Sequence, residues 1–521
     1  MMSEHEALLV THPEGEVKSK GRQTEEAGPS LDTFAGKVQV KWVPEGAVSA
    51  LGQMPFFIEF LKTSGLFDGL EKDCPLNYTS PNAPAKRDVL GTILLSVLAG
   101  HWRYAHISAI RGDGVNPGLL GMTKVASEDS VRRALKGLEA ERAEEWLRKH
   151  LKASYQPLLD EPWALDVDTT VKPLYGHQQD AERGYNPTKP GRPSHAYHTS
   201  FIAGLRMVTD VEVQAGNQTA SSYAQPELWK MLDEMPEPSR PAFIRGDCGW
   251  GTERAMEGAE RRGIPYLFKL KQTANVKKLI DKLFDASAWV DAGQQWQGLE
   301  SQLQLSGWTR KRRVVVLRRP LREPAASKKK TTRTAGQLAL DLPETTYRGV
   351  RYEYAVLVTS MQGEVRTIAQ LYRDRGDAEN NFDELKNQWG WSGFTTQDRN
   401  RCQIMARFTA LIYNWWTIFM RLGIPDRHAE AITSRPLALQ GIARQTRHAN
   451  QTTVEITSTH SMAPLIQAAL TKVSAFFKHL KESAEQLTHP ARWRLILRAA
   501  FRSFLGGRLL GSTQRLADSL G

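Results

Sequence analysis

The sequence predicts an α/β protein with a mixed sheet, and three observations support that fold class. WALDVDTTV, residues 163–171, has the β-branched content and alternation of a strand. SHAYHTSFIAGLRMVTDVEVQAG, which starts at residue 194, has the pattern of one or two further strands. Helical and strand patterns then alternate through PELWKMLDEM, PAFIR, GTERAMEGAERRG and PYLFKLK. Strands followed by alternating helices and strands are typical of an α/β layer architecture.

Other patterns flank and interrupt this core. The N-terminal stretch is polar and aperiodic, which predicts a disordered tail, and the region after it has mainly helical periodicity. RRVVVLRR and YRGVRYEYAVLVTS are β-type runs on either side of PAASKKKTTRTAG, which predicts a loop. RNRCQIMARFTALIYNWWTIFMRL predicts a helix that packs on the sheet. We divide the chain into a tail (1–36), a mainly helical region (37–160), a first core segment (161–273), a β-rich insertion (274–360), a second core segment (361–425) and a helical C-terminal region (426–521).

Charge and cysteine content limit the classes of function. Lys and Arg outnumber Asp and Glu by 69 to 57, and the net charge of +12 favours an acidic polymer as partner. The three cysteines have no metal-ligand or disulfide spacing, as expected in a reducing compartment. The most apolar run, FTALIYNWWTIFM, is too short to cross a bilayer, and the N-terminus does not resemble a secretory signal. We therefore expect a cytoplasmic protein with no membrane partner.

A basic helix is predicted within the N-terminal helical region. Ser127 is the expected N-cap of SEDSVRRALKGLEAERAEEWLRKHL, with acids in the first turn and basic residues after it. A helix that exposes Arg132 and Arg133 can lie against DNA, as recognition helices do. A structural helix with a solvated basic face fits the same residues equally well.

Two predicted strands carry aspartates that suit metal binding. Asp166 and Asp168 are two residues apart in WALDVDTTV, so both side chains point to one face of the sheet. A buried acidic face is costly unless a partner such as a cation compensates it. Asp247 follows a short apolar strand, at the carboxyl end where open α/β sheets usually place their sites. Taken singly, an Asp at a strand end is more often a turn or cap residue.

YRDRGDAENNFDELK, residues 372–386, predicts one helix with a functional edge. At about 100° per residue, four polar side chains fall on one narrow stripe beside an apolar one. These four are Tyr372, Arg375, Glu379 and Lys386. The stripe can line a cleft, although a solvated helix with ordinary i, i+4 pairs has the same composition. Three acids, from two strands and this helix, can together hold two divalent ions about 3.5 to 4 Å apart for attack at a phosphodiester. Mg2+ is the expected ion, and Mn2+ can substitute.

These residues carry a resemblance to a known family. The four stripe residues match the Tyr-x2-Arg-x3-Glu-x6-Lys signature of the DDE transposases of the bacterial insertion-sequence-four group and its relatives at every spacing. DVDTT resembles the first Asp motif of that family and RGDCGW the second, and residues 274–360 fall where the family inserts a β-domain. The RGD-x-G form resembles the relatives named for insertion sequence thirteen-eighty. The resemblance covers residues from about 160 to 425.

The resemblance implies an RNase H-like catalytic domain and a DNA transposase activity. Asp168, Asp247 and Glu379 would be the catalytic, metal-binding triad for two Mg2+ ions. The reaction would be nicking at the transposon ends, attack by the freed 3'-hydroxyl, in some relatives through a hairpin, and joining to target DNA. The expected partners are double-stranded DNA, as terminal inverted repeats and target, and a second copy of the chain in a homodimeric synaptic complex. The expected location is the nucleoid of a bacterial cytoplasm.

The same resemblance assigns roles to the DNA-facing residues. Arg375 and Lys386 would neutralise phosphate near the cleaved end, and Tyr372 would hydrogen-bond or stack there. Trp308, in the β-rich insertion, is a candidate to receive a base displaced during hairpin formation, although a lone Trp is more often core packing. Asp166 is the rival for the first acidic position, but a Thr of the family pattern follows Asp168 only.

Other readings of the sequence remain. His195 and His198 are expected to be strand or loop residues, because two-metal phosphoryl transfer needs no such general base. A metal-dependent nuclease of the RNase H fold would share every feature described above except the joining of DNA. A non-catalytic, domesticated DNA-binding protein would share the basic charge but need not keep all three acids.

Overall fold

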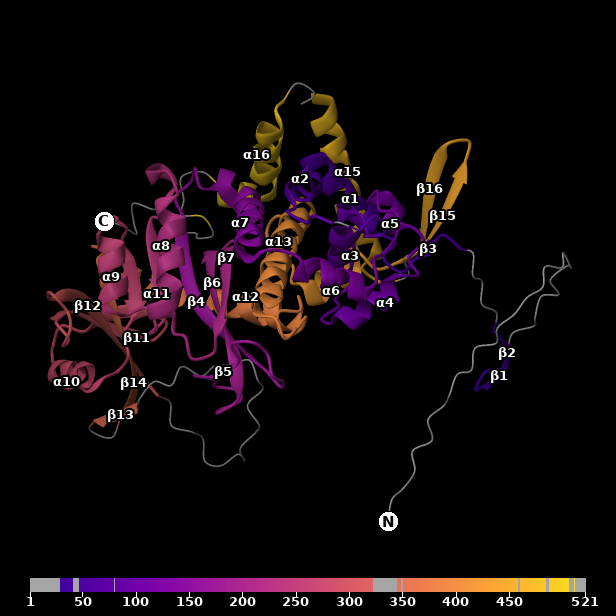
Figure 1. Ribbon diagram of the computed structural model, residues 1–521. Helices are drawn as coiled ribbons and strands as arrows, with labels where there is room; N and C mark the ends of the chain where they lie inside the picture. The colour runs from indigo at the N-terminus through magenta and orange to yellow at the C-terminus, as the bar shows by residue number, and fades with distance from the viewer. Residues whose placement is uncertain are drawn as a thin grey trace, which may run out of the picture. The chain divides into compact units, whose positions relative to one another are not determined.

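A mixed sheet of eleven strands dominates the computed structural model (Figure 1). The structure describes residues 29–40, 46–78, 80–321, 344–347, 350–457, 460–483, 487–505 and 510. The chain divides into two units, Met1–Gly46 and Ala47–Gly521, and the sheet belongs to the second. In the first, β1 (Ser30–Thr33) and β2 (Gly36–Gln39) form an antiparallel hairpin. Most of the predicted tail, residues 1–28, lies outside the described residues.

The centre of the sheet consists of five strands in the order β7-β6-β4-β8-β9. The first three form an antiparallel meander, made of β4 (Ala164–Pro173), β6 (Pro193–Ile202) and β7 (Met207–Ala215). Two short strands, β8 (Phe243–Gly246) and β9 (Tyr266–Lys269), continue it parallel to β4. Along the chain, α8 (Gln225–Asp233) precedes β8, and α9 (Glu253–Glu260) lies between β8 and β9. The predicted α/β class with a mixed sheet is therefore confirmed.

The predicted β-rich insertion extends this same sheet. After α10 (Ala274–Leu283), the strands are β10 (Val290–Gly293), β11 (Trp296–Leu303), β12 (Arg312–Pro320), β13 (Glu344–Tyr347) and β14 (Val350–Thr359). β14 pairs antiparallel with β9, and β12, β11 and β10 follow in order. A two-residue strand, β5 (Glu182–Arg183), pairs with β6 at the opposite side. The predicted loop PAASKKKTTRTAG lies outside the described residues.

The two faces of the sheet pack against different helices. Leu165 and Val167 of β4 belong to the large core that also contains Met256 of α9. Ala164, on the opposite face of β4, belongs to a smaller core that contains Ile368 of α11 (Val365–Arg373). Because side chains alternate along a strand, the even-numbered aspartates of β4 lie on the α11 side. The candidate site is therefore confined to one face of the sheet.

Helices on either side of the core complete the second unit. The N-terminal ones are α1 (Met54–Ser64), α2 (Leu66–Asp73), α3 (Lys86–Leu98), α4 (Ile107–Ile110), α5 (Asn116–Leu119), α6 (Glu128–Lys136) and α7 (Ala140–Tyr155). Ser127 accepts a hydrogen bond from the Ser130 amide, as the predicted N-cap of α6. The long helix α13 (Arg399–Gly423) is almost wholly buried and packs on β7 and α7, as predicted for a core helix.

The C-terminal region differs from the expectation that it is helical throughout. It contains α14 (Ala431–Ala438), α15 (Ala463–Ser483) and α16 (His489–Ala500), but also β15 (Ile442–His448) and β16 (Gln451–Thr457). β15 pairs with β16 on one side and with the short β3 (Val48–Ser49) on the other, which makes a separate three-stranded sheet. The physical reason is composition, because QTTVEIT is rich in β-branched residues that favour strands. Over the described part of the chain, no helix has both the length and the apolar content that a membrane span requires.

Candidate active site

Asp166 is occupied by a structural ion pair. Its two carboxylate oxygens accept hydrogen bonds from Arg245 Nε at 2.5 Å and Nη2 at 2.7 Å, and both side chains are buried. Arg245 Nη1 also donates to the carbonyl oxygen of Leu371 in α11. The pair therefore joins β4, β8 and α11, and it leaves no carboxylate oxygen of Asp166 free for a further ligand. Asp166 is thus placed apart from the candidate triad of Asp168, Asp247 and Glu379.

Asp168 lies in the middle of β4, beside Asp247, which directly follows the carboxyl end of the parallel strand β8. β4 and β8 pair in register at Asp166 with Arg245 and at Val167 with Gly246. Continuing that alignment by one residue places Asp168 beside Asp247. Asp247 Oδ1 accepts a hydrogen bond from the Gly249 amide at 2.9 Å, which fixes the turn after β8. The backbone of each aspartate is therefore held in place, by strand β4 for Asp168 and by the turn after β8 for Asp247.

The predicted single helix over 372–386 is divided in two. α11 ends at Arg373 and α12 (Gly376–Asn387) begins after a turn at residues 374–375. The Arg375 amide donates to the Tyr372 carbonyl and the Ala378 amide to that of Arg375, so i, i+3 bonds replace the α-helical pattern here. Gly376, which has a low helix propensity, follows the turn. The expected continuous stripe is therefore wrong in detail, because Tyr372 lies on α11 while Glu379 and Lys386 lie on α12.

The turn places Arg375 directly on Asp168. Arg375 Nη2 donates to Asp168 Oδ2, and the Asp168 Oδ1 atom accepts from the Thr169 amide at 2.7 Å. Burial raises the pKa of Asp168 to about 7, Arg375 opposes the rise, and the charges of Asp247 and Glu379 add to it. Glu379, in the first turn of α12, is exposed, and within the described residues it makes no hydrogen bond or ion pair. The charges of Arg375, Asp247 and Glu379 thus all act on Asp168.

Two further polar groups belong to the same site. The Tyr372 hydroxyl is buried without a hydrogen-bond partner among the described residues, and burial raises its pKa. Lys269 was missed by the sequence analysis: continuing the register of β8 with β9 places it beside Asp247. Burial lowers the pKa of Lys269, and Arg375, Asp247 and Glu379 are among the charges that act on it. Its position at the end of a strand parallel to β8 was the signal that could have identified it.

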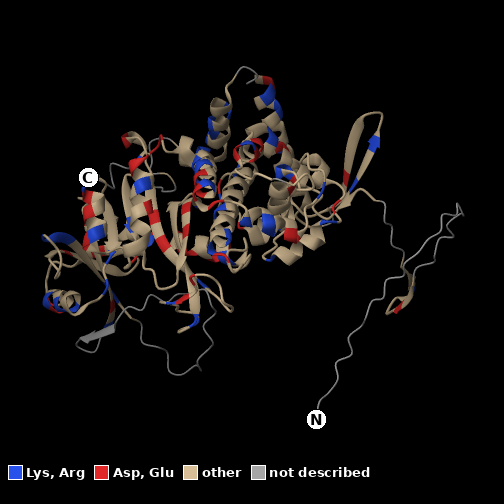
Figure 2. Cartoon of the chain, viewed as in Figure 1, with Lys and Arg blue, Asp and Glu red and all other residues tan. Residues whose placement is uncertain are grey.

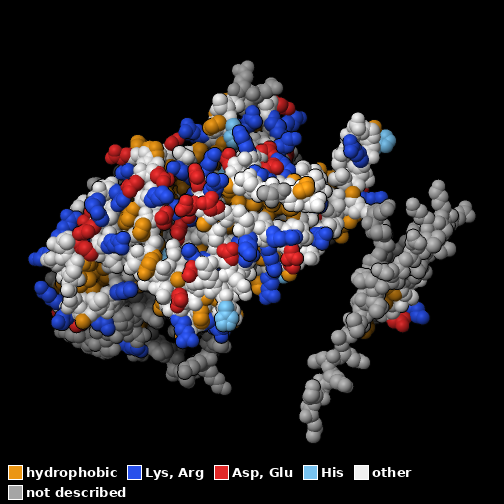
Figure 3. All heavy atoms as spheres, in the orientation of Figure 1, with side chains coloured by type: hydrophobic (Ala, Val, Ile, Leu, Met, Phe, Trp, Pro, Cys, Tyr) orange, Lys and Arg blue, Asp and Glu red, His pale blue; other side chains and the backbone are white. Residues whose placement is uncertain are grey.

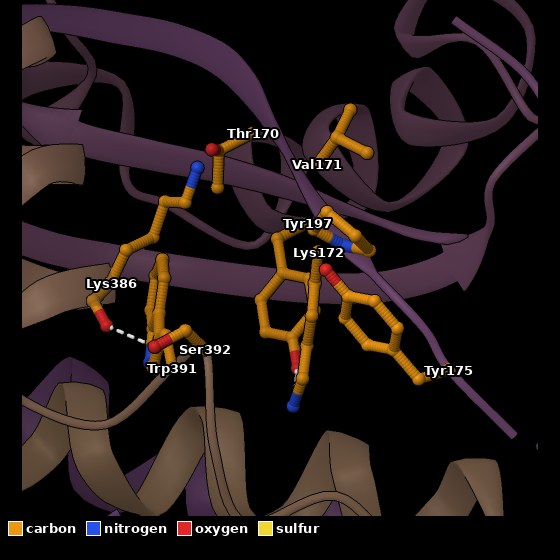
Figure 4. A pocket seen from close by; sticks show the side chains of 9 residues that line it. Thr170, Val171, Lys172, Tyr175, Tyr197, Lys386, Trp391 and Ser392 are labelled. Atoms are coloured by element: carbon orange, nitrogen blue, oxygen red, sulfur yellow. Dashed lines mark hydrogen bonds between the residues drawn. The ribbon is translucent and has the colours of Figure 1, made fainter. Parts of the chain in front are cut away.

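Lys386 borders a cavity of about 200 Å3 next to the acids (Figure 4). Its side chain extends toward Thr170, two residues after Asp168 on β4. Lys172 lies deeper and donates from Nζ to the Gly393 carbonyl oxygen at 2.5 Å, and burial lowers its pKa to about 8. The cavity is lined by Thr170, Val171, Lys172, Pro173, Tyr175, Tyr197, Lys386, Trp391 and Ser392. Two amines and three aromatic rings make it suitable for a phosphate and a stacked base.

The other residues singled out from the sequence lie away from the triad. Trp308 is buried between β11 and β12, with the Arg312 guanidinium 5.5 Å from its ring, which favours a packing role in this conformation. Arg132 stacks on the Tyr104 ring at 5.3 Å, whereas Arg133 is exposed on α6. The two histidines of β6 are buried and bonded within the protein, His195 to the Gln179 carbonyl and His198 to Thr169.

The chemistry of the triad fits a hard divalent cation. Its donors are carboxylate oxygens, the type that Mg2+ prefers, and one arginine leaves them with excess negative charge. Their ligand atoms do not all lie within 4.8 Å of one another. Among the described residues, the group of acids with that spacing is a different one, Glu144, Glu212 and Glu227. Arg148 forms ion pairs with all three, so guanidinium already fills the position of a cation there.

Comparison with known proteins identifies a family and a distant similarity to a solved structure. The family model described as Transposase DDE domain group 1 matches residues 83–477. Among solved structures, the chain is similar to the cryo-EM structure of the piggyBac transposase synaptic complex with hairpin DNA, at 10% sequence identity and a TM-score of 0.37. That similarity covers 86% of this chain and 85% of the other. No curated protein sequence matches the chain.

Proposed function

Because the chain belongs to the Transposase DDE domain group 1 family, we propose that it is a DNA transposase that cleaves the ends of its element and joins them to target DNA. One observation carries the proposal: Asp168 on β4 lies beside Asp247 at the end of β8, where the charge of Glu379 on α12 also acts. Three acids from these positions form the catalytic triad. The signature of Tyr372, Arg375, Glu379 and Lys386 supports placement near the insertion-sequence-four group, with RGD-x-G favouring the thirteen-eighty relatives.

The strand order supports an RNase H-like catalytic core. An antiparallel meander followed by two strands parallel to its first strand, in the order β7-β6-β4-β8-β9, is the arrangement expected of that fold. We propose that residues 161–273 and 361–425 form this core, with 274–360 as an insertion that enters and leaves it beside β9. The flanking segments 37–160 and 426–521 would bind DNA and join two copies of the chain.

Asp168, Asp247 and Glu379 are the residues that would hold two divalent ions, with Mg2+ as the expected ion and Mn2+ as a substitute. When bound, such ions activate the attacking water or 3'-hydroxyl and stabilise the leaving oxygen. Asp168 must lose its proton to act as a ligand, and Arg375 favours that loss by lying against its Oδ2 atom. Asp166 takes no part, because Arg245 holds both of its oxygens.

The basic and aromatic residues around the triad position the DNA. Lys269 lies beside Asp247 at the end of β9 and Lys386 lies on α12 near Thr170, so their amines can hold phosphates of the bound strand. The unpartnered hydroxyl of Tyr372 is a donor for a phosphate oxygen. A hairpin intermediate needs a displaced base, and the aromatic cavity beside Lys386 is better placed for it than the buried Trp308. Arg133 on α6 would contact DNA further away.

The direct test is to incubate the purified protein with labelled duplexes carrying the element ends and Mg2+. We expect nicked and then joined products, and none from Asp168→Asn, which keeps the shape of the site but removes the charge. A precleaved end with a free 3'-hydroxyl separates the transposase from the alternative of an RNase H-fold nuclease. Cleavage without any joining of the precleaved end would establish the nuclease, and end binding without cleavage would establish a non-catalytic DNA-binding protein.

A further inference from the structure

β15 and β16 form a two-stranded ribbon that extends beyond the rest of its sheet (Figure 1). β3 pairs with it at Ala443 and Arg444 alone, close to its base. Beyond the cross-strand pair of Gln445 and Val454, eight consecutive residues, 446–453, are exposed. Three residues of strand per side, joined by the turn at residues 449–450, correspond to a reach of about 10 Å. An isolated two-stranded ribbon is only marginally stable in water, so this length favours a bound partner.

The base of the ribbon is fixed to the helix that carries Glu379. The Glu384 carboxylate of α12 accepts a hydrogen bond from the Ala431 amide, at the start of α14, at 3.0 Å. Near the end of α14, Arg435 donates to the Gln388 carbonyl oxygen that follows α12. The Gln53 side chain, just before α1, donates to the carbonyl oxygens of residues 437 and 440 at 2.7 and 2.8 Å. The ribbon begins two residues later, so its base has a defined position relative to the catalytic helix.

The exposed end of the ribbon has the chemistry of a DNA-contacting surface. Residues 446–453, TRHANQTT, contain no carboxylate and consist of one cation and several hydrogen-bonding side chains. Arg447, His448 and Gln451 make no side-chain hydrogen bond or ion pair within the described part of the chain. The end of the ribbon has a blue segment and no red one in the cartoon of Figure 2, and Figure 3 shows blue and pale-blue side chains there. Such groups match phosphates and base edges, and the end lacks the apolar surface that a protein partner would bury.

We propose that this ribbon enters the major groove of the element's own terminal repeat and contributes to its sequence-specific recognition. The major groove, about 12 Å wide, accepts a two-stranded ribbon. Arg447 and Thr452 are cross-strand partners and therefore share one face of the ribbon. Arg is suited to guanine and the Thr methyl group to the thymine methyl group, so these two are the residues that read the sequence. Terminal repeats, unlike target sites, present one fixed sequence to every copy of the enzyme. The inference rests on the proposed function, because it assigns the DNA bound by a transposase.

The test compares two ribbon variants with a charge control on the same ribbon. In the first, Arg447→Ala and Thr452→Ala are combined, which leaves the turn residues Ala449 and Asn450, both with positive φ, unchanged. In the second, Asn-Gly replaces residues 446–453 and joins the paired residues Gln445 and Val454 by a tight turn. Glu455→Gln is the control, since it changes a charge at the base of the ribbon and leaves residues 446–453 intact. Affinity is measured for a duplex with the terminal repeat and for a scrambled duplex of equal length.

The preference is the ratio of the affinity for the terminal-repeat duplex to that for the scrambled duplex. In both ribbon variants this ratio should fall at least about tenfold, since each bidentate base contact contributes about 1 to 3 kcal/mol. Glu455→Gln should keep the preference. An unchanged ratio in both variants would overturn the proposal. A dimer that becomes a monomer in sedimentation velocity, with the ratio unchanged, would assign the ribbon to a second copy instead. Joining of a precleaved end, assayed with the wild type, tests the proposed function separately.

Discussion

Two groups of acids in this molecule are chemically alike but differ in the arginines that contact them. The candidate triad has one direct ion pair, from Arg375 to Asp168. The second group, which we call the ionic cluster, combines four acids with two arginines, each of which contacts several acids. Its members are Glu144, Asp210, Glu212, Glu227, Arg148 and Arg407. The cluster has the tighter spacing of ligand atoms, yet each of its four acids already contacts a guanidinium group.

The comparison shows that a perturbed carboxylate does not by itself mark a metal site. Burial raises the pKa of Asp168 and that of Glu212 to about 7 in the same way. What differs is the partner, because two guanidinium groups contact Glu212 at 2.5 Å, whereas Asp168 has one and faces other acids. Charge-assisted hydrogen bonds from two arginines already satisfy the Glu212 carboxylate. Carboxylates that lack a direct cationic partner, as Asp247 and Glu379 do among the described residues, are therefore the feature that favours a cation at the triad, rather than spacing or pKa.

The largest expected effect is on cleavage. Asp247→Asn keeps the hydrogen bond that Asp247 Oδ1 accepts from the Gly249 amide but removes the charge. Loss of a metal ligand should cost about 4 kcal/mol of transition-state stabilisation, or about 10³-fold in rate. Glu227→Gln, in the ionic cluster, should cleave like the wild type. Single-turnover cleavage of labelled ends measures both, and binding to the same ends shows that each variant is folded. Equal losses in the two variants would remove the distinction between the groups.

The next effect is on folding and concerns the ionic cluster. Arg407 is buried on α13 and contacts Asp210 and Glu212 at 3.1 and 2.5 Å. Arg407→Ala leaves buried carboxylates without that partner, so the free energy of unfolding should fall by about 3 to 5 kcal/mol. Urea denaturation measures it, with and without Mg2+. A loss below about 1 kcal/mol, or one that Mg2+ restores, would show that the cluster is a cation site after all.

A smaller effect is expected from Lys386, at the edge of the triad. Lys386→Ala should weaken the hold on phosphate by about 1.5 to 3 kcal/mol and reduce the products that follow nicking. Nicking itself should persist, because the three acids are untouched. A time course that resolves nicked, hairpin and joined DNA measures the division of roles. Lys152→Ala, at the end of α7, is a control outside the site. If nicking falls as much as joining, Lys386 belongs to the first step as well.

The smallest effect is a shift in pH dependence. Arg375 lies against Asp168 and lowers its pKa, which burial has raised to about 7. Asp168 binds a cation only without its proton, so metal-dependent nicking should rise with pH through about 7. Removing the positive charge in Arg375→Ala raises the pKa of Asp168 further and moves that rise to higher pH. Nicking rates measured from pH 6 to 9 test the direction. A rise at unchanged or lower pH would contradict the assigned contact.

Local patterns predicted much of the core and the candidate triad. Alternation in WALDVDTTV placed Asp168 on a strand face, and the strand-end rule singled out Asp247, because both depend on neighbours in sequence. The break at residues 374–375 was missed, since the helical periodicity continues through it. Arginine partners were missed because they lie far along the chain: Arg245 is 79 residues from Asp166, and Arg407 is 197 from Asp210. Only the folded sheet and helix α13 bring these groups together.

The most direct test of the central claim is to locate the cations. Crystals of the protein bound to a terminal-repeat duplex, grown with Mn2+, would be measured at the manganese absorption edge. We expect two anomalous peaks about 3.5 to 4 Å apart, with Asp168 between them and with Asp247 and Glu379 as the outer ligands. No peak should lie among Glu144, Glu212 and Glu227. A peak in the ionic cluster and none at the triad would contradict the account.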